Sequence, residues 1–240
     1  MILNKLLSAI AVICITLLSP SLAHAQAEQQ IKTEIQKKLG PNAKVKSVSA
    51  APVPGLYEVL VGNEIFYTDT SGKYLIQGEI IELASGKNIT EQRQTDLNRI
   101  KWADLNQANS IKTVRGNGSR QLAVFSDPNC GYCKRLEKSL QQLDNVTVYT
   151  YLIPILGADS LQKSKQILCS ADPSKAYIDW MISGTAPSGK TDCNTPLDKN
   201  TAFAKTYGIT GTPTLFFTDG SRFPGAVQIT DIEKKFSTLK

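Results

Sequence analysis

The stretch Phe-Ser-Asp-Pro-Asn-Cys-Gly-Tyr-Cys at residues 125–133 determines how the second half of this chain folds and where its chemistry lies. It ends an apolar run at 121–125 that is typical of a strand, and it leads into a helix whose apolar stripe includes Leu136 and Leu140. A second apolar run, at 146–153, follows closely. Strand, helix and strand in this order predict a βαβ unit, with two cysteines where the helix begins.

Cys130 and Cys133 are two thiols three residues apart at the expected N-terminus of that helix. The unpaired backbone N–H groups and the positive end of the helix dipole favour the thiolate of Cys130. A thiolate is the species that attacks a disulfide, and Cys133 can then resolve the mixed disulfide. A structural disulfide between the two is one alternative, although so short a loop stabilises little. A four-cysteine zinc site is another, although Cys169 and Cys193 lack the usual paired spacing.

The N-terminus has the pattern of a secretory signal peptide. An apolar run at 6–18 is followed by Ala23-His24-Ala25, which offers small residues to a signal peptidase, so we expect residues 1–25 to be removed. A membrane anchor is the alternative, but the run is shorter than the ~20 residues that span a bilayer. His24 is the only histidine, so the mature chain would have none. Catalysis by Ser–His or Cys–His pairs and metal sites with histidine ligands are then excluded.

The composition is that of an ordinary globular protein. The chain has 240 residues, 41% of them hydrophobic, and a formal net charge of +6. Basic and acidic residues are interspersed, and no dense basic run points to nucleic acid. Cys169 ends an apolar helical stretch and Cys193 lies in a polar loop, so we predict a structural disulfide between them. Closing a loop of this length contributes roughly 3.5 kcal/mol in the chain-entropy model.

Residues 26–86 have the pattern of a small module with one helix and an antiparallel sheet. Apolar residues at four-residue spacing predict a helix over 26–39. Strands are expected at 57–61 and 64–68, joined by the hairpin pair Gly62-Asn63, and a further one over 74–83. A module of this size buries a small fraction of its surface and is marginally stable alone, which favours pairing with a second copy.

Residues 87–110 are predicted to connect this module to the next. Asn88 and Glu91 resemble a capping box, and an apolar stripe from Leu97 to Leu105 suggests a linker helix. Residues 106–118 are mostly polar and are expected to be loop.

The region after the βαβ unit is expected to contain helices and then a hairpin. Three helices are predicted, beginning near Asp159 with a cap involving Gln162, near Asp172-Pro173, and near Thr195-Pro196 with the proline at the first helical position. Strands at 214–218 and 222–227 flank the turn pair Asp219-Gly220, and a last helix begins with a capping box from Thr230 to Glu233.

Gly211-Thr212-Pro213 stands directly before the first strand of that hairpin. A cis Thr212–Pro213 bond would present a free backbone edge beside the thiols, where an extended substrate segment could pair. A trans turn is the alternative.

Taken together, these features resemble the DsbC type of periplasmic thiol:disulfide interchange proteins, over essentially the whole expected mature chain. The residues that carry the resemblance are the Cys-Gly-Tyr-Cys motif in its context, Gly211 to Pro213, the Cys169/Cys193 pair and the stretch Gly-Lys-Tyr-Leu-Ile-Gln-Gly at 72–78. CxxC alone is moderately specific, whereas this set in this order is highly specific.

The resemblance implies an α+β / α/β architecture with a thioredoxin-like catalytic domain at 111–240 that carries a helical insertion. Before it would come a dimerisation domain at 26–86, consisting of a helix and an antiparallel sheet, and a linker helix and loop at 87–110. It implies a periplasmic disulfide isomerase that works without a cofactor or a metal. It also implies a homodimer whose cleft binds misfolded exported proteins, and a membrane reductase of the DsbD type that keeps the dithiol reduced.

By position, the resemblance makes Cys130 the nucleophile, Cys133 the resolving thiol and Pro213 the cis-proline. Gly131, Tyr132 and Thr212 would join Pro213 in contacting the substrate.

Two other activities remain open at this stage: a net thiol oxidase, and a chaperone-like binding module with secondary redox activity. One position departs from classical thioredoxins, because Val124 replaces the buried aspartate six residues before the nucleophile. The acceptor for the Cys133 proton is therefore open, with Lys134 and Asp127 as candidates by proximity.

Overall fold

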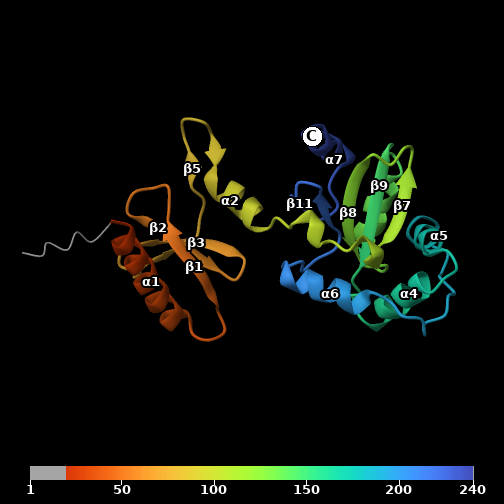
Figure 1. Cartoon of the computed structure of the whole chain (residues 1–240), viewed down its shortest axis with the longest axis horizontal. Coiled ribbons are helices and arrows are strands. Elements are labelled where there is room, and N and C mark those ends of the chain that lie inside the picture. Colours follow the sequence, from red (N-terminus) through yellow and green to blue (C-terminus); the bar gives the residue numbers. More distant parts are fainter. Residues whose placement is uncertain (1–19, 240) are drawn as a thin grey trace, which may run out of the picture. The chain divides into compact units, whose positions relative to one another are not determined.

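The computed structural model describes residues 20–239 and divides the chain into two compact units. The first unit ends at Ile80 and the second begins at Ile81 (Figure 1). The expected signal peptide lies almost wholly outside the described residues. Over 20–239, no helix is long and apolar enough to cross a membrane.

The first unit consists of one helix and a four-stranded antiparallel sheet. Its elements, in sheet order after the helix, are α1 (Pro20–Leu39), β1 (Val45–Ala50), β2 (Leu56–Val61), β3 (Glu64–Asp69) and β4 (Leu75–Ile76). Ile31 and Ile35 of α1 are buried against Val45, Val48 and Val59 of the sheet. The predicted helix and hairpin are confirmed, and α1 begins earlier than the expected residue 26 because its helical backbone continues back to Pro20.

The strand predicted over residues 74–83 is wrong. Only Leu75–Ile76 pairs with β3, while Ile81–Glu82 forms β5 and pairs instead with β6 (Lys87–Asn88). The apolar residues that suggested a continuous strand are largely exposed: Tyr74 by 69% and Leu83 by 93%. An apolar segment forms a stable strand where a second layer covers one of its faces, and none of the described residues buries these side chains.

The linker helix is shorter than predicted. Helix α2 (Ile89–Leu97) begins as expected, since the Asn88 side chain accepts a hydrogen bond from the Glu91 backbone N–H at 3.0 Å. It ends at Leu97, and the chain continues in two short 3₁₀ turns, η1 (Trp102–Asp104) and η2 (Gln107–Asn109).

Ile100 and Leu105, which the prediction placed on the linker helix, are core residues of the second unit. They are 5% and 6% exposed. The Ile100 N–H donates to the Gly220 carbonyl at 3.1 Å, and an added Cβ on Gly220 would lie 2.0 Å from the Ile100 oxygen. With a φ of +80° as well, this turn accepts only glycine. The segment after α2 is therefore fixed to the second unit.

The second unit is built on a five-stranded mixed sheet in the order β11-β10-β8-β9-β7. The strands are β7 (Ile111–Arg115), β8 (Arg120–Ser126), β9 (Val146–Leu152), β10 (Thr214–Phe217) and β11 (Arg222–Pro224). β8 and β9 are parallel and every other pair is antiparallel, which confirms the βαβ unit and the C-terminal hairpin. The prediction of loop over 106–118 is wrong, because residues 111–115 form an edge strand whose polar composition hid its pairing with β9.

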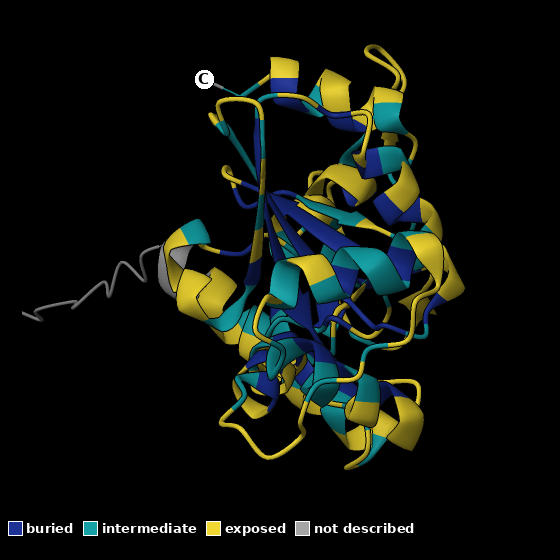
Figure 2. Cartoon of the chain, turned by 90° about the vertical axis from the view of Figure 1, so that its right-hand side faces the viewer, coloured by how far each residue is buried: buried dark blue, intermediate teal, exposed yellow. Residues whose placement is uncertain are grey.

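Helices cover both faces of this sheet. Alternate residues of β8 point to opposite sides: Leu122 and Val124 pack with α3 (Gly131–Leu140) and α7 (Ile229–Ser237), and Ala123 and Phe125 pack with α6 (Leu197–Thr206). Buried residues accordingly concentrate in the strands (Figure 2). Both faces of β8 and β9 are covered, which explains their continuous apolar sequences.

The helical insertion between β9 and β10 contains α4 (Ala158–Leu168), α5 (Pro173–Ile178) and η3 (Asp179–Ser183), followed by α6. α5 begins at Asp172-Pro173 as predicted, and the Asp172 side chain caps it by accepting a hydrogen bond from the Lys175 N–H at 2.9 Å. α4 begins near Asp159 as predicted, but it follows Gly157 and no side chain caps it. Pro196 is the residue before α6 rather than its first, and α7 follows Gln228 rather than the predicted cap Thr230.

Candidate active site

The turn between β8 and α3 is held by Asp127, whose carboxylate is fully buried. That carboxylate accepts hydrogen bonds from the Asn129 N–H (2.8 Å), the Leu156 N–H (3.0 Å) and the Ser160 hydroxyl (2.7 Å). The Asp127 carbonyl accepts from the Cys130 N–H at 3.0 Å. Because the Asp127 carboxylate already accepts three hydrogen bonds, its role is to hold the turn in place. The structure therefore does not support Asp127 as the acceptor of the Cys133 proton.

Cys130 is the residue that caps α3. Its sulfur accepts a hydrogen bond from the Cys133 N–H at 3.3 Å, in the place that an N-cap oxygen usually takes. A negative charge on this sulfur would be stabilised both by that N–H and by the helix dipole. Cys130 is a free thiol and, at 6% exposed, the more accessible of the two.

Cys133 lies one turn into α3 and is 2% exposed. Burial raises its pKa to about 12, and the Cys130 side chain adds to that shift, while hydrogen bonds from the Asp127 backbone and the Ser126 and Thr212 side chains act against it. At neutral pH this cysteine is therefore a thiol, and it needs a base before it can act as a nucleophile.

The Thr212–Pro213 peptide bond is cis, and it lies beside the dithiol. The Cys130 thiol donates to the Thr212 carbonyl at 3.3 Å, across 82 residues of sequence. β10 begins immediately afterwards, at Thr214. The structure thus brings Cys130, Cys133, Thr212 and Pro213 together, as expected.

The surface next to the motif is apolar. Tyr132 is 62% exposed, and Gly131 is exposed with nothing within 4 Å of the position that a Cβ would occupy. Ile155 and Leu156 are also exposed, and the Leu156 N–H is bound to the Asp127 carboxylate, so this loop adjoins the motif. Sequence analysis did not identify the loop at 155–156, although its two apolar residues follow directly on the buried end of β9.

Lys134 is held away from the resolving thiol. Its ammonium group lies 3.8 Å from the centroid of the Trp180 ring, and the Trp180 indole N–H donates to the Pro128 carbonyl at 2.6 Å. Burial lowers the pKa of Lys134, as do the nearby charges of Lys163 and Lys138. The Lys134 ammonium group is therefore engaged by the Trp180 ring, and none of the hydrogen bonds described joins it to Cys133.

Cys169 and Cys193 form a disulfide with an S–S distance of 1.97 Å. Neither can then ligate a metal, which removes the four-cysteine zinc alternative. The disulfide closes the loop that follows α4. The same insertion supplies Tyr177 and Met181, which pack in one cluster with Cys130 and Cys133.

Two hydroxyl-bearing residues at the site were not foreseen. Ser126 is fully buried, and its hydroxyl lies 2.9 Å from the Tyr177 hydroxyl. From the sequence, Tyr177 was only one residue of the helix expected to begin near Asp172-Pro173, and Ser126 was only the residue after the apolar run at 121–125. The two residues are 51 positions apart in the sequence, so no local sequence pattern predicts the hydrogen bond between them.

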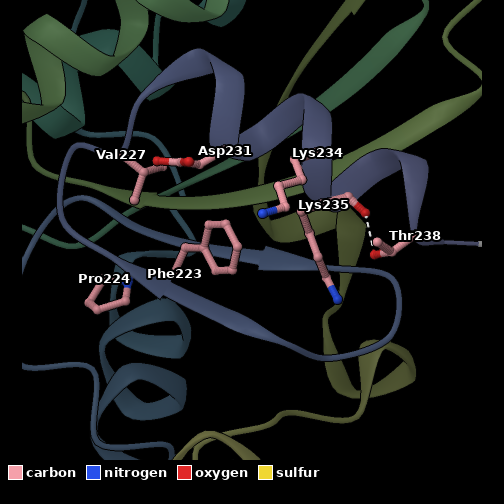
Figure 3. Close-up of a pocket in the computed structure, with 7 residues that line it drawn as sticks. All are labelled: Phe223, Pro224, Val227, Asp231, Lys234, Lys235 and Thr238. Carbon is pink, nitrogen blue, oxygen red and sulfur yellow. Dashed lines mark hydrogen bonds between the residues drawn. The ribbon is translucent and has the colours of Figure 1, made fainter. Parts of the chain in front are cut away.

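A separate cavity of about 500 Å³ lies between β11 and α7 (Figure 3). Phe223 and Pro224 line it from the strand side, and Lys234, Lys235 and Thr238 line it from the helix. It shares no residue with the dithiol site.

Two family models match the chain. A thioredoxin-like domain matches residues 107–240, and the disulfide bond isomerase protein N-terminal domain matches residues 22–91. The N-terminal match extends from the first unit into the start of the second, and the thioredoxin-like match covers the second unit from residue 107 onward.

Known relatives agree with these matches. A probable thiol:disulfide interchange protein DsbC of Bordetella pertussis is 39% identical over 181 residues, which is 75% of this chain and 64% of that protein. The thiol:disulfide interchange protein DsbC of Escherichia coli is 26% identical over 215 residues, or 88% of each chain. The crystal structure of a disulfide interchange protein from Neisseria gonorrhoeae superposes with a TM-score of 0.53 at 38% identity, covering 55% of this chain and 96% of that one.

The dithiol at the start of α3, the adjacent cis-proline and the two matched domains lead to one assignment. This chain belongs to the DsbC family of thiol:disulfide interchange proteins, with a thioredoxin-like domain preceded by the N-terminal domain of that family.

Proposed function

We propose that this protein is a disulfide isomerase and reductase of the periplasm that rearranges incorrect disulfides in exported proteins. The observation that carries the proposal is the position of Cys130. Its sulfur caps α3, accepts the Cys133 N–H, and lies 3.3 Å from the carbonyl that precedes a cis-proline. A nucleophilic sulfur is thereby held beside a backbone edge on which an extended substrate can dock.

The reaction begins when the Cys130 thiolate attacks a substrate disulfide. A Cys130–substrate mixed disulfide forms, and the other substrate sulfur leaves as a thiolate. A second substrate thiolate can then displace Cys130, which isomerises the substrate and regenerates the enzyme. Alternatively, Cys133 attacks Cys130, which releases reduced substrate and leaves a Cys130–Cys133 disulfide. That oxidised form needs a reductant, for which we propose a membrane protein of the DsbD type.

The exposed apolar residues beside the motif support a protein substrate. Tyr132, Ile155 and Leu156 form an apolar rim next to Cys130, and misfolded proteins expose apolar segments. Pro213, Thr212 and Gly131 would contact the substrate backbone. Removal of residues 1–25 would deliver the mature chain to the periplasm, an oxidising compartment in which disulfides such as Cys169–Cys193 persist.

The experiment that tests this function is reactivation of a scrambled, fully oxidised multi-disulfide protein by the reduced mature chain, with no other redox source. We expect reactivation at substoichiometric amounts of the chain, because isomerisation regenerates the reduced enzyme. A net oxidase would instead give no reactivation, and its oxidised form would rapidly oxidise a reduced substrate. Suppression of aggregation by a Cys130→Ala/Cys133→Ala variant would indicate an additional chaperone-like role.

We also propose that the first unit makes the protein a homodimer. The matched N-terminal domain of the DsbC family supports this, and so does β4, which lies at the edge of the four-stranded sheet. Leu75 and Ile76 of β4 are 42% and 44% exposed. An open edge with apolar side chains is a surface suited to pairing with a second copy.

The mature chain is therefore expected to sediment as a dimer, and Leu75→Lys/Ile76→Lys is expected to weaken the dimer by about tenfold or more, because charges would replace apolar contacts. The matched control is Val114→Lys, which changes an aliphatic residue 51% exposed on β7, an edge strand of the other sheet. That variant should remain a dimer. Sedimentation of the wild type as a monomer at micromolar concentration would contradict the proposal.

A further inference from the structure

The two residues that follow Cys133 on α3 are both cations, Lys134 and Arg135. Each of them contacts an aromatic ring. The Lys134 ammonium group lies 3.8 Å from the centroid of the Trp180 ring, and Arg135 Cζ lies 5.3 Å from the centroid of the Tyr132 ring. Within residues 20–239, neither cation forms an ion pair with a carboxylate. Their N–H donors therefore remain available to another partner.

Lys134 is held close to the turn that leads to Cys130. Its backbone N–H donates to the Cys130 carbonyl at 3.1 Å, so Lys134 lies one helical turn after Cys130 on the same face. Side chains on a helix lean toward its N-terminus, which here is the end that carries the dithiol. The Trp180 ring that contacts Lys134 is itself bound to this turn, because its indole N–H donates to the Pro128 carbonyl at 2.6 Å.

The acids on α3, on α4, on η3 and in the turn before α3 already have partners. The ion pairs are Asp159 with Lys163, Asp179 with Lys175, and Glu137 with Arg115. The Asp127 carboxylate is buried and accepts three hydrogen bonds within the turn and from α4. The positive charges that follow the dithiol are thus not balanced by an acid of these elements.

A second ammonium group adds to this positive charge. Lys163 Nζ lies 5.1 Å from the centroid of the Trp180 ring, so one indole ring contacts two cations. Asp159 neutralises Lys163, and its carboxylate also accepts from the Asn129 side chain at 2.7 Å. Lys134 is the cation of this pair that has no counter-ion among the residues described, and a carboxylate from another molecule would supply one.

We propose that Lys134 and Arg135 bind a carboxylate of the substrate, so that this protein reacts preferentially with disulfides that have aspartate or glutamate next to the attacked cysteine. The proposal rests on the proposed thiol-exchange function and names a substrate class for it. An extended chain advances about 3.3 Å per residue, so the neighbours of a cysteine bound at Cys130 lie within reach of a lysine or arginine side chain. Trp180 acts through Lys134 and is a positioning residue.

The preference also has an electrostatic reason. The attacking Cys130 thiolate is negative and repels an acidic substrate segment, and the two cations offset that repulsion where the segment approaches. The bonds that form and break are those of ordinary thiol exchange. The Cys130 thiolate attacks the substrate sulfur, a new S–S bond forms, and the other sulfur of the old bond leaves with its electron pair.

The test compares three peptides that each contain one cysteine, flanked on both sides by glutamate, by glutamine or by lysine. Each cysteine is joined by a disulfide to 2-thiopyridine, a neutral group whose release as the thione changes the absorbance. Reduced mature chain is mixed with an excess of peptide, and the second-order rate constant is measured in a single turnover. Each value is divided by the rate constant of the same peptide with 2-mercaptoethanol, which corrects for the intrinsic reactivity of its disulfide.

We expect the corrected rate constant of the glutamate peptide to exceed that of the lysine peptide by about 5- to 10-fold at an ionic strength of about 0.01 M. The ratio should fall toward one as salt is added, because salt screens exposed charges. In Lys134→Gln the ratio should fall about threefold, since one of the two cations is lost. Lys134→Glu should reverse the preference.

The matched control is Lys234→Gln, which removes the same charge from an exposed lysine of α7 that lines the separate cavity. The ratio in this variant should equal that of the wild type. Trp180→Phe keeps an aromatic ring but loses the bond to the Pro128 carbonyl, and its ratio should lie between those of the wild type and Lys134→Gln. A purely structural role for Trp180 would change all three rate constants by one factor and leave the ratio unchanged.

Three results would overturn the proposal: equal corrected rate constants for the three peptides with the wild type, a ratio that Lys134→Gln leaves unchanged, or a fall in that variant by the same factor for every peptide. The last result would mean that Lys134 acts only on the Cys130 thiolate. Failure of the wild type to release thiopyridine from the neutral glutamine peptide would instead overturn the proposed function.

Discussion

Replacement of Cys130 with alanine is expected to abolish every thiol-exchange reaction of this protein, with a loss of at least about a thousandfold that leaves only background reactivation of a scrambled substrate. The reason is geometric. Cys130 is the thiol that receives the Cys133 N–H and lies beside the carbonyl that precedes the cis-proline. Cys133 is buried, has a pKa of about 12 and has no comparable site on which a substrate could dock.

The matched control is Cys133→Ala, which removes the other free thiol of the same motif. It should leave the first attack intact and accumulate mixed disulfides, visible as high-mass adducts on non-reducing gels. Activity that survives in Cys130→Ala, or adducts that form through Cys133, would refute the assignment of the nucleophile.

Removal of the disulfide by Cys169→Ala/Cys193→Ala is expected to lower the free energy of unfolding by roughly 3.5 kcal/mol. The sequence separation of 24 residues determines the size of this loss of stability. Without the disulfide, the unfolded chain has more conformational freedom, and this stabilises the unfolded state. The native loop is tightly packed against α4: a Cβ added to Gly189 would lie 2.1 Å from the Gln166 carbonyl oxygen. Loss of the disulfide should therefore also loosen the insertion that carries Tyr177.

Equilibrium unfolding in urea, followed by tryptophan fluorescence, measures this effect. The free energy of unfolding should fall more steeply with urea concentration in the variant, because an unfolded chain without the disulfide exposes more surface. The oxidised and reduced forms of the unmutated protein supply the control. An unchanged free energy of unfolding would contradict a stabilising role for this disulfide.

The βαβ unit and its dithiol could be predicted from the sequence because their signals are local. The apolar runs of β8 and β9 reflect burial on both faces, and the motif lies where strand gives way to helix. The cap at Asn88 and the helix start at Asp172-Pro173 were predicted correctly for a similar reason. The side chains of Asn88 and Asp172 each accept a hydrogen bond from a backbone N–H three residues further along the chain.

Apolar patterns failed where tertiary contacts decide the outcome. Ile100 and Leu105 continue the periodicity of α2, yet they leave the helix because the core beside Phe125 offers them more burial. Residues 74–83 are rich in the apolar residues typical of a strand, yet most of these side chains contact no second layer among the described residues. Edge strand β7 was missed because it carries only two apolar residues, the buried Ile111 and the exposed Val114.

The buried polar group around Cys133 could not be predicted from the sequence. Ser126, Tyr177 and Glu137 come from a strand, the helical insertion and α3, and only the fold brings the first two within 2.9 Å of each other. The absence of an acid at position 124 was visible in the sequence, but the contact between Ser126 and Tyr177 was not.

The segment after α2 is attached to the turn at Gly220. This attachment determines where a protease can cleave the chain without unfolding the second unit. A protease that cleaved just before Arg99 would release a C-terminal fragment that keeps Ile100 and Leu105 in its core, and Arg99 Nη1 also donates to the Asp219 carbonyl at 3.0 Å. Cleavage after Leu105 would strip those side chains from the face of the sheet that contains Phe125. A fragment beginning at residue 107, where sequence similarity to the thioredoxin-like domain starts, should therefore aggregate, while one beginning at residue 99 should stay folded and monodisperse.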